Sequence, residues 1–274
     1  MQFAEHPSWQ FETLRLHDIS PSIVMVEMNR PKFSNAFNTQ MAADLVQCFE
    51  QFAMNAYAAH SQPGVIILTG SGQKAFCAGG DLKERLDMTD DAWFAQHLVY
   101  ERMVRAILNT PQIVIGAING AAYGGGCELV AMLDFSYAAS HAKFAQTEVK
   151  LGIIPGAGGT QNLTRAVGEK RAKELILTGE VFSAEQAETW GLINGVVSSD
   201  ALLPHVIARA EAITSNGPVA VKQAKMAISR AQDLSLDDGL RFEIEAYNRC
   251  VSTQDRREGI AAFNEKRKAE FKGR

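Results

Sequence analysis

Two glutamates and two glycine-rich turns are the residues best suited to chemistry in this 274-residue chain. The turns are Ala75-Phe-Cys-Ala-Gly-Gly-Asp-Leu-Lys and Asn119-Gly-Ala-Ala-Tyr-Gly-Gly-Gly-Cys-Glu-Leu, and each follows an apolar segment and precedes a predicted helix. Glycine lets a ligand approach the backbone closely, and the first N–H groups of a helix have no intrahelical acceptor. If the turns converge, their amides can stabilise negative charge on an oxygen atom, as in an oxyanion hole.

The glutamates are Glu128 and Glu148. Glu128 lies three residues after Gly125, on the same face of a predicted helical turn, and the surrounding residues 127–133 are mostly apolar. Burial in such a setting disfavours the charged form of a carboxylate. Two carboxyl groups in different environments can accept a proton from water and supply a proton to carbon. The residues therefore favour addition of water to a double bond, although ordinary exposed or ion-paired glutamates remain the alternative.

Other classes of function find less support. Neither turn matches GxxxxGK[ST] or GxGxxG, so a nucleotide site is not indicated. The net charge of −4 and pI near 5.9 give no basic surface for nucleic acid. An RNA-binding role would depend on a small basic group at the C-terminal end, and a scaffolding role would leave both glutamates unused. The basic group consists of Lys266, Arg267, Lys268, Lys272 and Arg274.

The remaining composition indicates a cytoplasmic globular protein. The four cysteines are far apart and lack CxxC spacing, which favours reduced thiols over a zinc site or a disulfide framework. The first residues lack the pattern of a signal peptide. The most apolar stretch, residues 113–133, contains Asn119, Glu128 and several glycines, so we interpret it as buried core and not as a membrane span.

The elements that must position these residues alternate between strand and helix in the first two-thirds of the chain, which predicts an α/β fold. Predicted strands cover 11–16, 22–28, 64–70 and 113–118, and predicted helices cover 38–58 and 89–109. The strands 11–16 and 22–28 are expected to pair across the turn at Ser20-Pro21. Segments 65–82 and 113–129 resemble each other loosely, since each contains a buried strand, a glycine-containing turn and the start of a helix.

Helical patterns dominate after about residue 165. Predicted helices cover 170–178, 183–190, 201–215, 219–230, 236–250 and 253–268, with a single further strand at 194–197. We expect residues 1–200 to form the core with the active site, and residues 201–274 to form a helical oligomerisation region. Packing of these helices on their own domain is the alternative.

Four ordered motifs resemble the enoyl-CoA hydratase (crotonase) family. They are Ala75-Phe-Cys-Ala-Gly-Gly-Asp-Leu-Lys-Glu, Gly124-Gly-Gly-Cys-Glu-Leu, Ala145-Gln-Thr-Glu and Gly152-Ile-Ile-Pro-Gly-Ala-Gly-Gly-Thr-Gln. The resemblance implies a spiral of repeated β-β-α units with a C-terminal helical trimerisation region, and a homotrimer or homohexamer. It also implies an acyl-CoA thioester as substrate, with coenzyme A as part of that substrate and no separate cofactor or metal.

The family's catalytic roles fall on matching positions of this sequence. The resemblance implies that the amides of Ala78 and Gly125 hold the thioester oxygen. Glu128 and Glu148 correspond to the two acid–base residues, and the amide of Gly156 would help to hold the water. Residues implied to line the acyl-CoA channel are Lys32, Phe33, Ala78, Gly80, Asp81, Leu82, Lys83, Tyr123, Phe263 and Lys266. The last of these matches a basic residue that reaches the coenzyme A phosphates of an adjacent subunit.

Three positions depart from the family's usual pattern: Thr147 replaces a proline, Tyr123 replaces a smaller residue, and Phe33-Ser34 replaces a small aliphatic pair. Within the family, a double-bond isomerase needs only one carboxylate, usually at the position of Glu148. Dehalogenases use an aspartate nucleophile that no motif places here. Glutamate at both positions therefore favours hydration of a 2-enoyl-CoA to a 3-hydroxyacyl-CoA.

Overall fold

The computed structural model describes residues 4–5, 9–56 and 63–274. The strands are β1 (Ala4–Glu5), β2 (Leu14–Ser20), β3 (Ile23–Met28), β4 (Val65–Gly70), β5 (Ala75–Cys77), β6 (Ile113–Ile118), β7 (Ala121–Tyr123), β8 (Phe135–Ala139), β9 (Lys143–Ala145), β10 (Phe182–Ser183) and β11 (Gly195–Val197).

The helices connect these strands and then continue to the C-terminal end. They are η1 (Pro31–Phe33), α1 (Thr39–Asn55), α2 (Leu82–Arg85), α3 (Asp90–Leu108), α4 (Gly125–Met132), η2 (Glu148–Leu151), α5 (Gly159–Val167), α6 (Glu169–Thr178), α7 (Ala184–Thr189), α8 (Ser199–Thr214), α9 (Pro218–Arg230), α10 (Leu236–Val251) and α11 (Gln254–Glu265).

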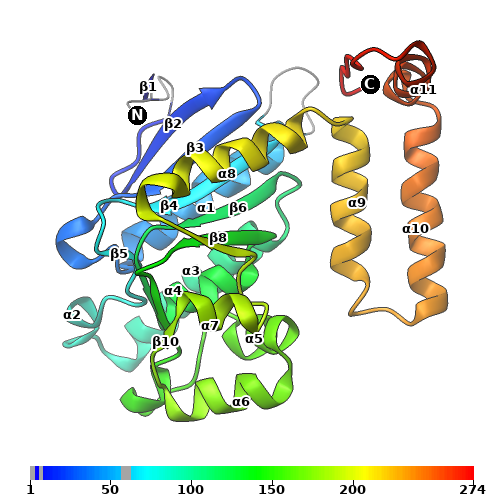
Figure 1. The fold of residues 1–274 in the computed structure, drawn as a ribbon. Helices are drawn as coiled ribbons and strands as arrows, with labels where there is room; N and C mark the ends of the chain where they lie inside the picture. The colour runs from blue at the N-terminus through cyan, green and yellow to red at the C-terminus, as the bar shows by residue number, and fades with distance from the viewer. Residues whose placement is uncertain (1–3, 6–8, 57–62) are drawn as a thin grey trace.

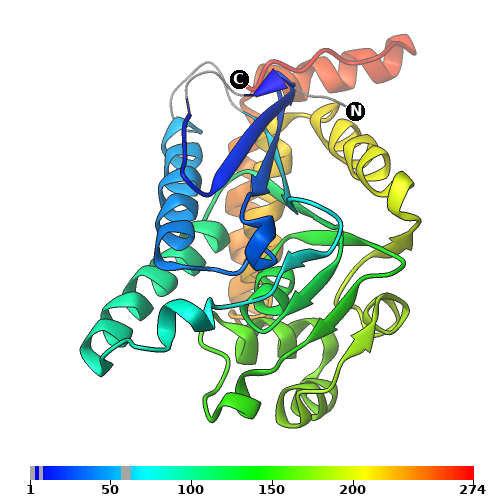
Figure 2. The same cartoon turned by 90° about the vertical axis from the view of Figure 1, so that its left-hand side faces the viewer.

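Two sheets form the frame of the molecule (Figures 1 and 2). The larger sheet has the order β1-β2-β3-β4-β6-β8-β11, and its strands from β3 onward are parallel. The smaller sheet has the order β10-β9-β7-β5, with β5, β7 and β9 parallel. The predicted α/β class is confirmed. The predicted hairpin is also present, although β2 begins at Leu14, later than expected, and continues to Ser20.

A repeated unit explains the loose internal resemblance in the sequence. In β4-β5-α2 and β6-β7-α4, the first strand joins the larger sheet, the second joins the smaller sheet, and a helix follows. The pair β8-β9 continues the pattern and leads into η2 and α5. The chain therefore winds as a spiral of β-β-α units, as predicted. Each second strand ends beside the start of a helix, where the candidate chemistry lies.

The larger sheet is covered on both faces. One face packs on α8 through a cluster that includes Ile67, Ile115, Leu202 and Val206. The other face joins the main core with α1, α3 and α4, which contains fully buried aromatic side chains such as Phe49. Helix α1 begins where predicted, with Asn38 accepting a hydrogen bond from the N–H of Met41. Its predicted end at residue 58 lies outside the described residues.

The C-terminal helices divide into two groups. Helix α8 lies within the predicted region 201–274 but packs on the larger sheet. Helices α9 and α10 form a pair that projects to one side of the core, and α11 lies at its end (Figure 1). This arm is anchored partly by the ion pair of Lys225 with Asp134, at 2.7 Å.

The cysteines are free thiols in the structure. Cys48, Cys77 and Cys127 are buried free thiols, and Cys250 is a partly buried one. Burial raises the pKa of the Cys77 thiol to about 12, so this group is not a nucleophile at neutral pH.

Within residues 4–5, 9–56 and 63–274, no helix combines the length and the apolar character that a membrane crossing requires.

Candidate active site

The two glycine-rich turns meet, as the sequence predicts. A methyl group added at Gly79 would lie 2.8 Å from the carbonyl oxygen of Tyr123 and 3.0 Å from the amide nitrogen of Gly125. One added at Gly126 would lie only 2.0 Å from the carbonyl oxygen of Cys77. Gly79 also has a φ of +89°, which side chains rarely tolerate. Glycine at these positions therefore lets the end of β5 touch the start of α4.

The two amides predicted to form the oxyanion hole, those of Ala78 and Gly125, differ in their hydrogen bonding. Gly125 is the first residue of α4, and among the described hydrogen bonds none is donated by its N–H. The helix dipole adds partial positive charge at this point. The N–H of Ala78 donates to the carbonyl oxygen of Ser34 at 3.1 Å. Ser34 has a left-handed backbone with a φ of 53°, which is unusual for a residue with a side chain.

Glu128 projects from the first turn of α4 into the core and is 2% exposed. Its Oε1 accepts hydrogen bonds from the N–H groups of Ala157, at 2.8 Å, and Gly159, at 2.7 Å. Close approach is possible because Gly159 lacks a side chain, since a methyl group there would lie 2.7 Å from Cγ of Glu128. The segment 152–161 therefore fixes the orientation of this carboxyl group.

Glu148 is the first residue of η2 and is also buried, with 8% exposure. Its Oε1 lies 3.1 Å from the position that a methyl group on Gly124 would take, which places the carboxyl group beside the α4 entrance. Its buried Oε2 has no hydrogen-bond partner among the residues that the structure describes. Thr147 replaces the usual proline, and the side chain of Glu148 still points to the glycine-rich turn.

Burial governs the protonation of this pair. Burial and, after it, the nearby charge of Glu148 raise the pKa of Glu128 to about 7, against the opposing effect of the Gly159 and Ala157 amides. Burial raises the pKa of Glu148 as well. Two neighbouring carboxyl groups with raised pKa values retain a proton at neutral pH more readily than isolated glutamates do. The site can therefore offer a proton acceptor and a proton donor together.

Gln146 is a residue to which the sequence analysis gave no role. Its side chain is 1% exposed, and neither its Nε2 nor its Oε1 has a hydrogen-bond partner. The Nε2 lies 2.8 Å from the position of a methyl group on Gly159, on the side that also faces Glu128. A buried amide without partners is rare and calls for a water or ligand contact. The motif containing Gln146 was recognised, but the burial of its side chain was not predictable from sequence.

The residues predicted to line the channel beside β5 are placed near the two turns but have different surroundings. Asp81 caps α2 by accepting from the N–H of Lys83, and it also pairs with Arg30 at 2.9 Å. Its role in the structure is therefore to fix the turn. Leu82 and Lys83 are exposed on α2, and Lys32 and Phe33 are exposed on η1. The exposed cations remain available for a ligand.

Three further predicted residues lie closer to the turns themselves. Gly80 follows Ala78 by two residues at the start of the α2 cap, and Tyr123 ends β7, immediately before the glycine run. Gly156 immediately precedes Ala157, and a methyl group on it would lie 2.8 Å from Cε1 of His97.

Phe263 and Lys266 do not join this site within one chain. Both belong to the end of α11, where Phe263 is 84% exposed and Lys266 is the left-handed C-terminal cap. Figure 1 shows α11 at the upper end of the α9–α10 pair, where α9 begins, well separated from α4.

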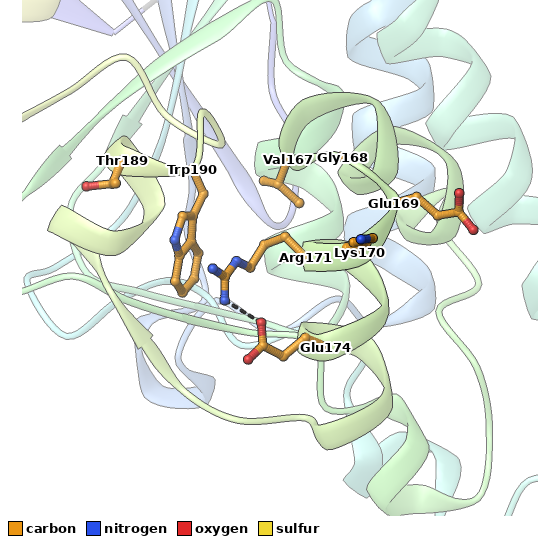
Figure 3. A pocket seen from close by; sticks show the side chains of 8 residues that line it. All are labelled: Val167, Gly168, Glu169, Lys170, Arg171, Glu174, Thr189 and Trp190. Atoms are coloured by element: carbon orange, nitrogen blue, oxygen red, sulfur yellow. Dashed lines mark hydrogen bonds and ion pairs between the residues drawn. The ribbon is translucent and has the colours of Figure 1, made fainter.

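A surface pocket of about 630 Å³ lies between α6 and the end of α7 (Figure 3). Its Arg171 pairs with Glu174 and stacks over the ring of Trp190, with Cζ 4.2 Å from the ring centroid. Neither Glu128 nor Glu148 lines it. This pocket is therefore separate from the candidate active site.

The spiral of β-β-α units brings two glycine-rich turns and two buried glutamates together in one site. The family model described as Enoyl-CoA hydratase/isomerase matches residues 18–274. The chain belongs to this family.

Several relatives resemble nearly the whole chain. It is 41% identical over 251 residues to a putative enoyl-CoA hydratase/isomerase of Bacillus subtilis, covering 92% of this chain and 95% of the relative. It is 40% identical over 253 residues to a short-chain-enoyl-CoA hydratase of Clostridium acetobutylicum, covering 92% and 95%. The crystal structure of an enoyl-CoA hydratase from Bacillus anthracis matches with a TM-score of 0.91 and 41% identity, covering 96% and 100%.

Proposed function

We propose that this enzyme hydrates a 2-enoyl-CoA to a 3-hydroxyacyl-CoA. The observation that carries the proposal is the pair of buried glutamates, Glu128 and Glu148, with raised pKa values beside the free amide of Gly125. A double-bond isomerase needs one such carboxyl group, whereas water addition uses two. Relatives that match nearly the whole chain are also named enoyl-CoA hydratases.

The first step is binding of the thioester carbonyl in the oxyanion hole. The N–H of Gly125 is available to the oxygen directly. The N–H of Ala78 must be shared with, or released from, the Ser34 carbonyl at 3.1 Å, which is a longer contact than the neighbouring bond from Phe37 to Gly79 at 2.7 Å. Two donors aimed at this oxygen stabilise the enolate that forms when Cβ is attacked.

Water then adds across the double bond. The carboxylate of one glutamate accepts a proton from the water as its oxygen bonds to Cβ, and the π electrons of the double bond move into the enolate. The carboxylic acid of the other glutamate gives its proton to Cα, and the carbonyl re-forms. The pair ends with its proton exchanged between partners, so no additional acid or base is needed. The unpaired amide of Gln146 and the N–H of Gly156 would hold the water in line.

The coenzyme A moiety would follow the exposed side chains near the turns. Lys32 and Lys83 supply positive charge for its phosphates, and Leu82 supplies an apolar contact. Phe263 and Lys266 would complete the channel from an adjacent subunit, because α11, at whose end they stand, lies far from α4 of the same chain (Figure 1). We therefore propose a homotrimer or homohexamer in the cytoplasm, assembled through the C-terminal arm.

Glutamine substitutions test the two-glutamate mechanism. We expect Glu128→Gln and Glu148→Gln each to lower kcat for crotonyl-CoA hydration by about 10²- to 10⁴-fold, because each removes one proton-transfer group. KM should change far less, since glutamine preserves shape. Loss of the conjugated-thioester absorbance measures the rate, and Glu101→Gln on the exposed face of α3 is the matched control. Full hydration by either active-site variant would contradict the mechanism.

A further inference from the structure

Arg85 lies beside the oxyanion turn without a role in the proposed hydration. It ends α2, and its Nη1 is 3.1 Å from the position that a methyl group on Gly80 would occupy. Gly80 follows Ala78 by two residues, so the guanidinium lies near the oxyanion turn. A side chain on Gly80 would crowd the guanidinium.

His97 approaches a second glycine in the same way. It projects from α3, and its Cε1 lies 2.8 Å from the position of a methyl group on Gly156. Gly156 immediately precedes Ala157, the residue whose N–H binds Glu128. His97 therefore borders the segment that holds the first glutamate.

Two aromatic rings of α3 join Arg85 and His97 into one cluster. Cζ of Arg85 lies 4.3 Å from the ring centroid of Trp93 and 5.1 Å from that of Tyr100. The His97 ring stacks on Trp93 at 6.5 Å and lies 6.2 Å from Tyr100. The Tyr100 hydroxyl donates to the carbonyl oxygen of Phe37 at 2.9 Å, which ties the cluster to the core beside the turns.

The hydrogen-bonding capacity of this cluster is only partly used. Nε of Arg85 donates to Gln96 at 2.8 Å, but in the described part of the chain Nη1 and Nη2 have no acceptor, and no carboxylate lies within 4.0 Å. A guanidinium is always charged, and it forms its strongest bonds with planar anions. Burial and the charge of Arg85 lower the pKa of His97, so its imidazole is neutral and offers one N–H.

We propose that Arg85 and His97 bind a carboxylate at the far end of the acyl chain. The thioester oxygen would lie at Gly125 and Cβ between the glutamates, so the acyl chain must continue along the walls formed by Gly80 and Gly156. The substrate class is then a 2-enoyl-CoA that ends in a carboxylate. The inference rests on the proposed hydration for the direction of the acyl chain.

A matched pair of substrates tests the inference. Glutaconyl-CoA and pent-2-enoyl-CoA have acyl chains of equal length and differ by a terminal carboxylate in place of a methyl group. We expect the wild-type kcat/KM to be at least about 10-fold higher for glutaconyl-CoA than for pent-2-enoyl-CoA, because a charge-assisted hydrogen bond to the carboxylate stabilises the complex by that amount. Arg85→Gln should lower this ratio by about 10- to 100-fold, and Arg85→Lys should retain part of it. His97→Leu should lower it by about 5-fold, as loss of one neutral hydrogen bond implies.

The ratio of the two rates separates an acyl carboxylate from a coenzyme A phosphate. A guanidinium that binds the coenzyme would, when removed, lower both kcat/KM values equally, and an unchanged ratio overturns the inference. A wild-type preference for pent-2-enoyl-CoA overturns it as well. Arg102→Gln on the outer face of α3, where Arg102 pairs with Glu50, is the control and should keep the wild-type ratio.

Binding measurements separate failure of this inference from failure of the proposed function. Glutaryl-CoA and pentanoyl-CoA lack the double bond, and their Kd values report the acyl end without catalysis. If neither enoyl-CoA is hydrated, the proposed function fails. Tighter binding of glutaryl-CoA that is lost in Arg85→Gln then still supports the carboxylate site, whereas equal binding overturns it.

Discussion

At the scale of single residues, two opposing effects act on the pKa of Glu128. Its burial disfavours the carboxylate, and the N–H groups of Ala157 and Gly159 favour it. The apolar neighbours in the sequence were enough to predict burial of this side chain. The two amides were not predictable, because they come from a loop about thirty residues later that only folding brings to the helix. The burial of Gln146 was not predictable either, because it also depends on contacts that only folding creates.

The raised pKa of Glu128 predicts a cost in stability. The side chain in the unfolded chain has the ordinary glutamate pKa of 4.5, whereas its pKa in the folded protein is about 7. Between these values the folded state binds more protons, so stability falls as pH rises through this window. The full loss above pH 7 is about 3 kcal/mol.

Glu128→Gln should remove this cost while keeping an oxygen acceptor for both amides. We expect the variant to exceed wild type in free energy of unfolding by about 3 kcal/mol at pH 8, with the difference shrinking toward pH 4.5. Urea denaturation across this range measures it, with Glu101→Gln as the control. A difference that does not change with pH would show that Glu128 has an ordinary pKa in the folded enzyme.

At the scale of elements, the segment between β3 and α1 fixes the oxyanion turn. Asn35 is fully buried with a φ of 53°, and its Nδ2 donates to the carbonyl oxygens of Ser71, at 3.0 Å, and Ala75, at 2.9 Å. Its Oδ1 accepts from the N–H of Arg30 at 3.0 Å. One side chain thereby ties the strand β5 to the preceding loop.

Removal of that side chain should loosen the turn. We expect Asn35→Ala to lower the free energy of unfolding by about 2–4 kcal/mol, because two carbonyl groups and one N–H lose their partner in the interior. Activity should fall together with stability, because Ala78, whose N–H belongs to the proposed oxyanion hole, directly follows β5. Chemical denaturation is the measurement, and Asn264→Ala on the surface of α11 is the control. Equal stability of the two variants would show that Asn35 does not secure β5.

The sequence predicted long elements well and short ones poorly. The six-residue strands β4 and β6 are mostly apolar runs rich in valine and isoleucine, which indicate buried strands without tertiary information. Strands β5 and β7 have three residues each, and their extended form depends on pairing with each other. No local pattern marks such a strand, so the second sheet was implied only by the family resemblance.

At the scale of the whole molecule, the C-terminal arm carries an unpartnered apolar face. Large side chains recur along one side of α10 and are exposed in the single chain, and they are Leu236, Leu240, Ile244, Tyr247 and Val251. Exposed apolar stripes of this kind mark contacts between protein surfaces. The helices themselves were predictable from their periodicity, but the projection of the arm from the core was not.

A charge in this stripe should prevent assembly. We expect Ile244→Glu to sediment as a monomer where the wild type sediments as a trimer or hexamer, because a carboxylate would be buried at the contact. Its KM for the thioester should rise by about 10-fold or more, because a monomer would lose the proposed contact between Lys266 of an adjacent subunit and a coenzyme A phosphate. Glu243→Gln on the same helix is the control, and sedimentation velocity is the measurement. A wild-type monomer, or an unaffected variant, would exclude assembly through α10.

The central claim is that this active site adds water to an enoyl thioester. The most direct measurement is mass spectrometry of the product formed by the wild-type enzyme from crotonyl-CoA in ¹⁸O-labelled water. The account predicts a product heavier than the substrate by one labelled water, with the label in the hydroxyl group on Cβ. A product of unchanged mass, as double-bond migration would give, or the absence of any product would contradict it.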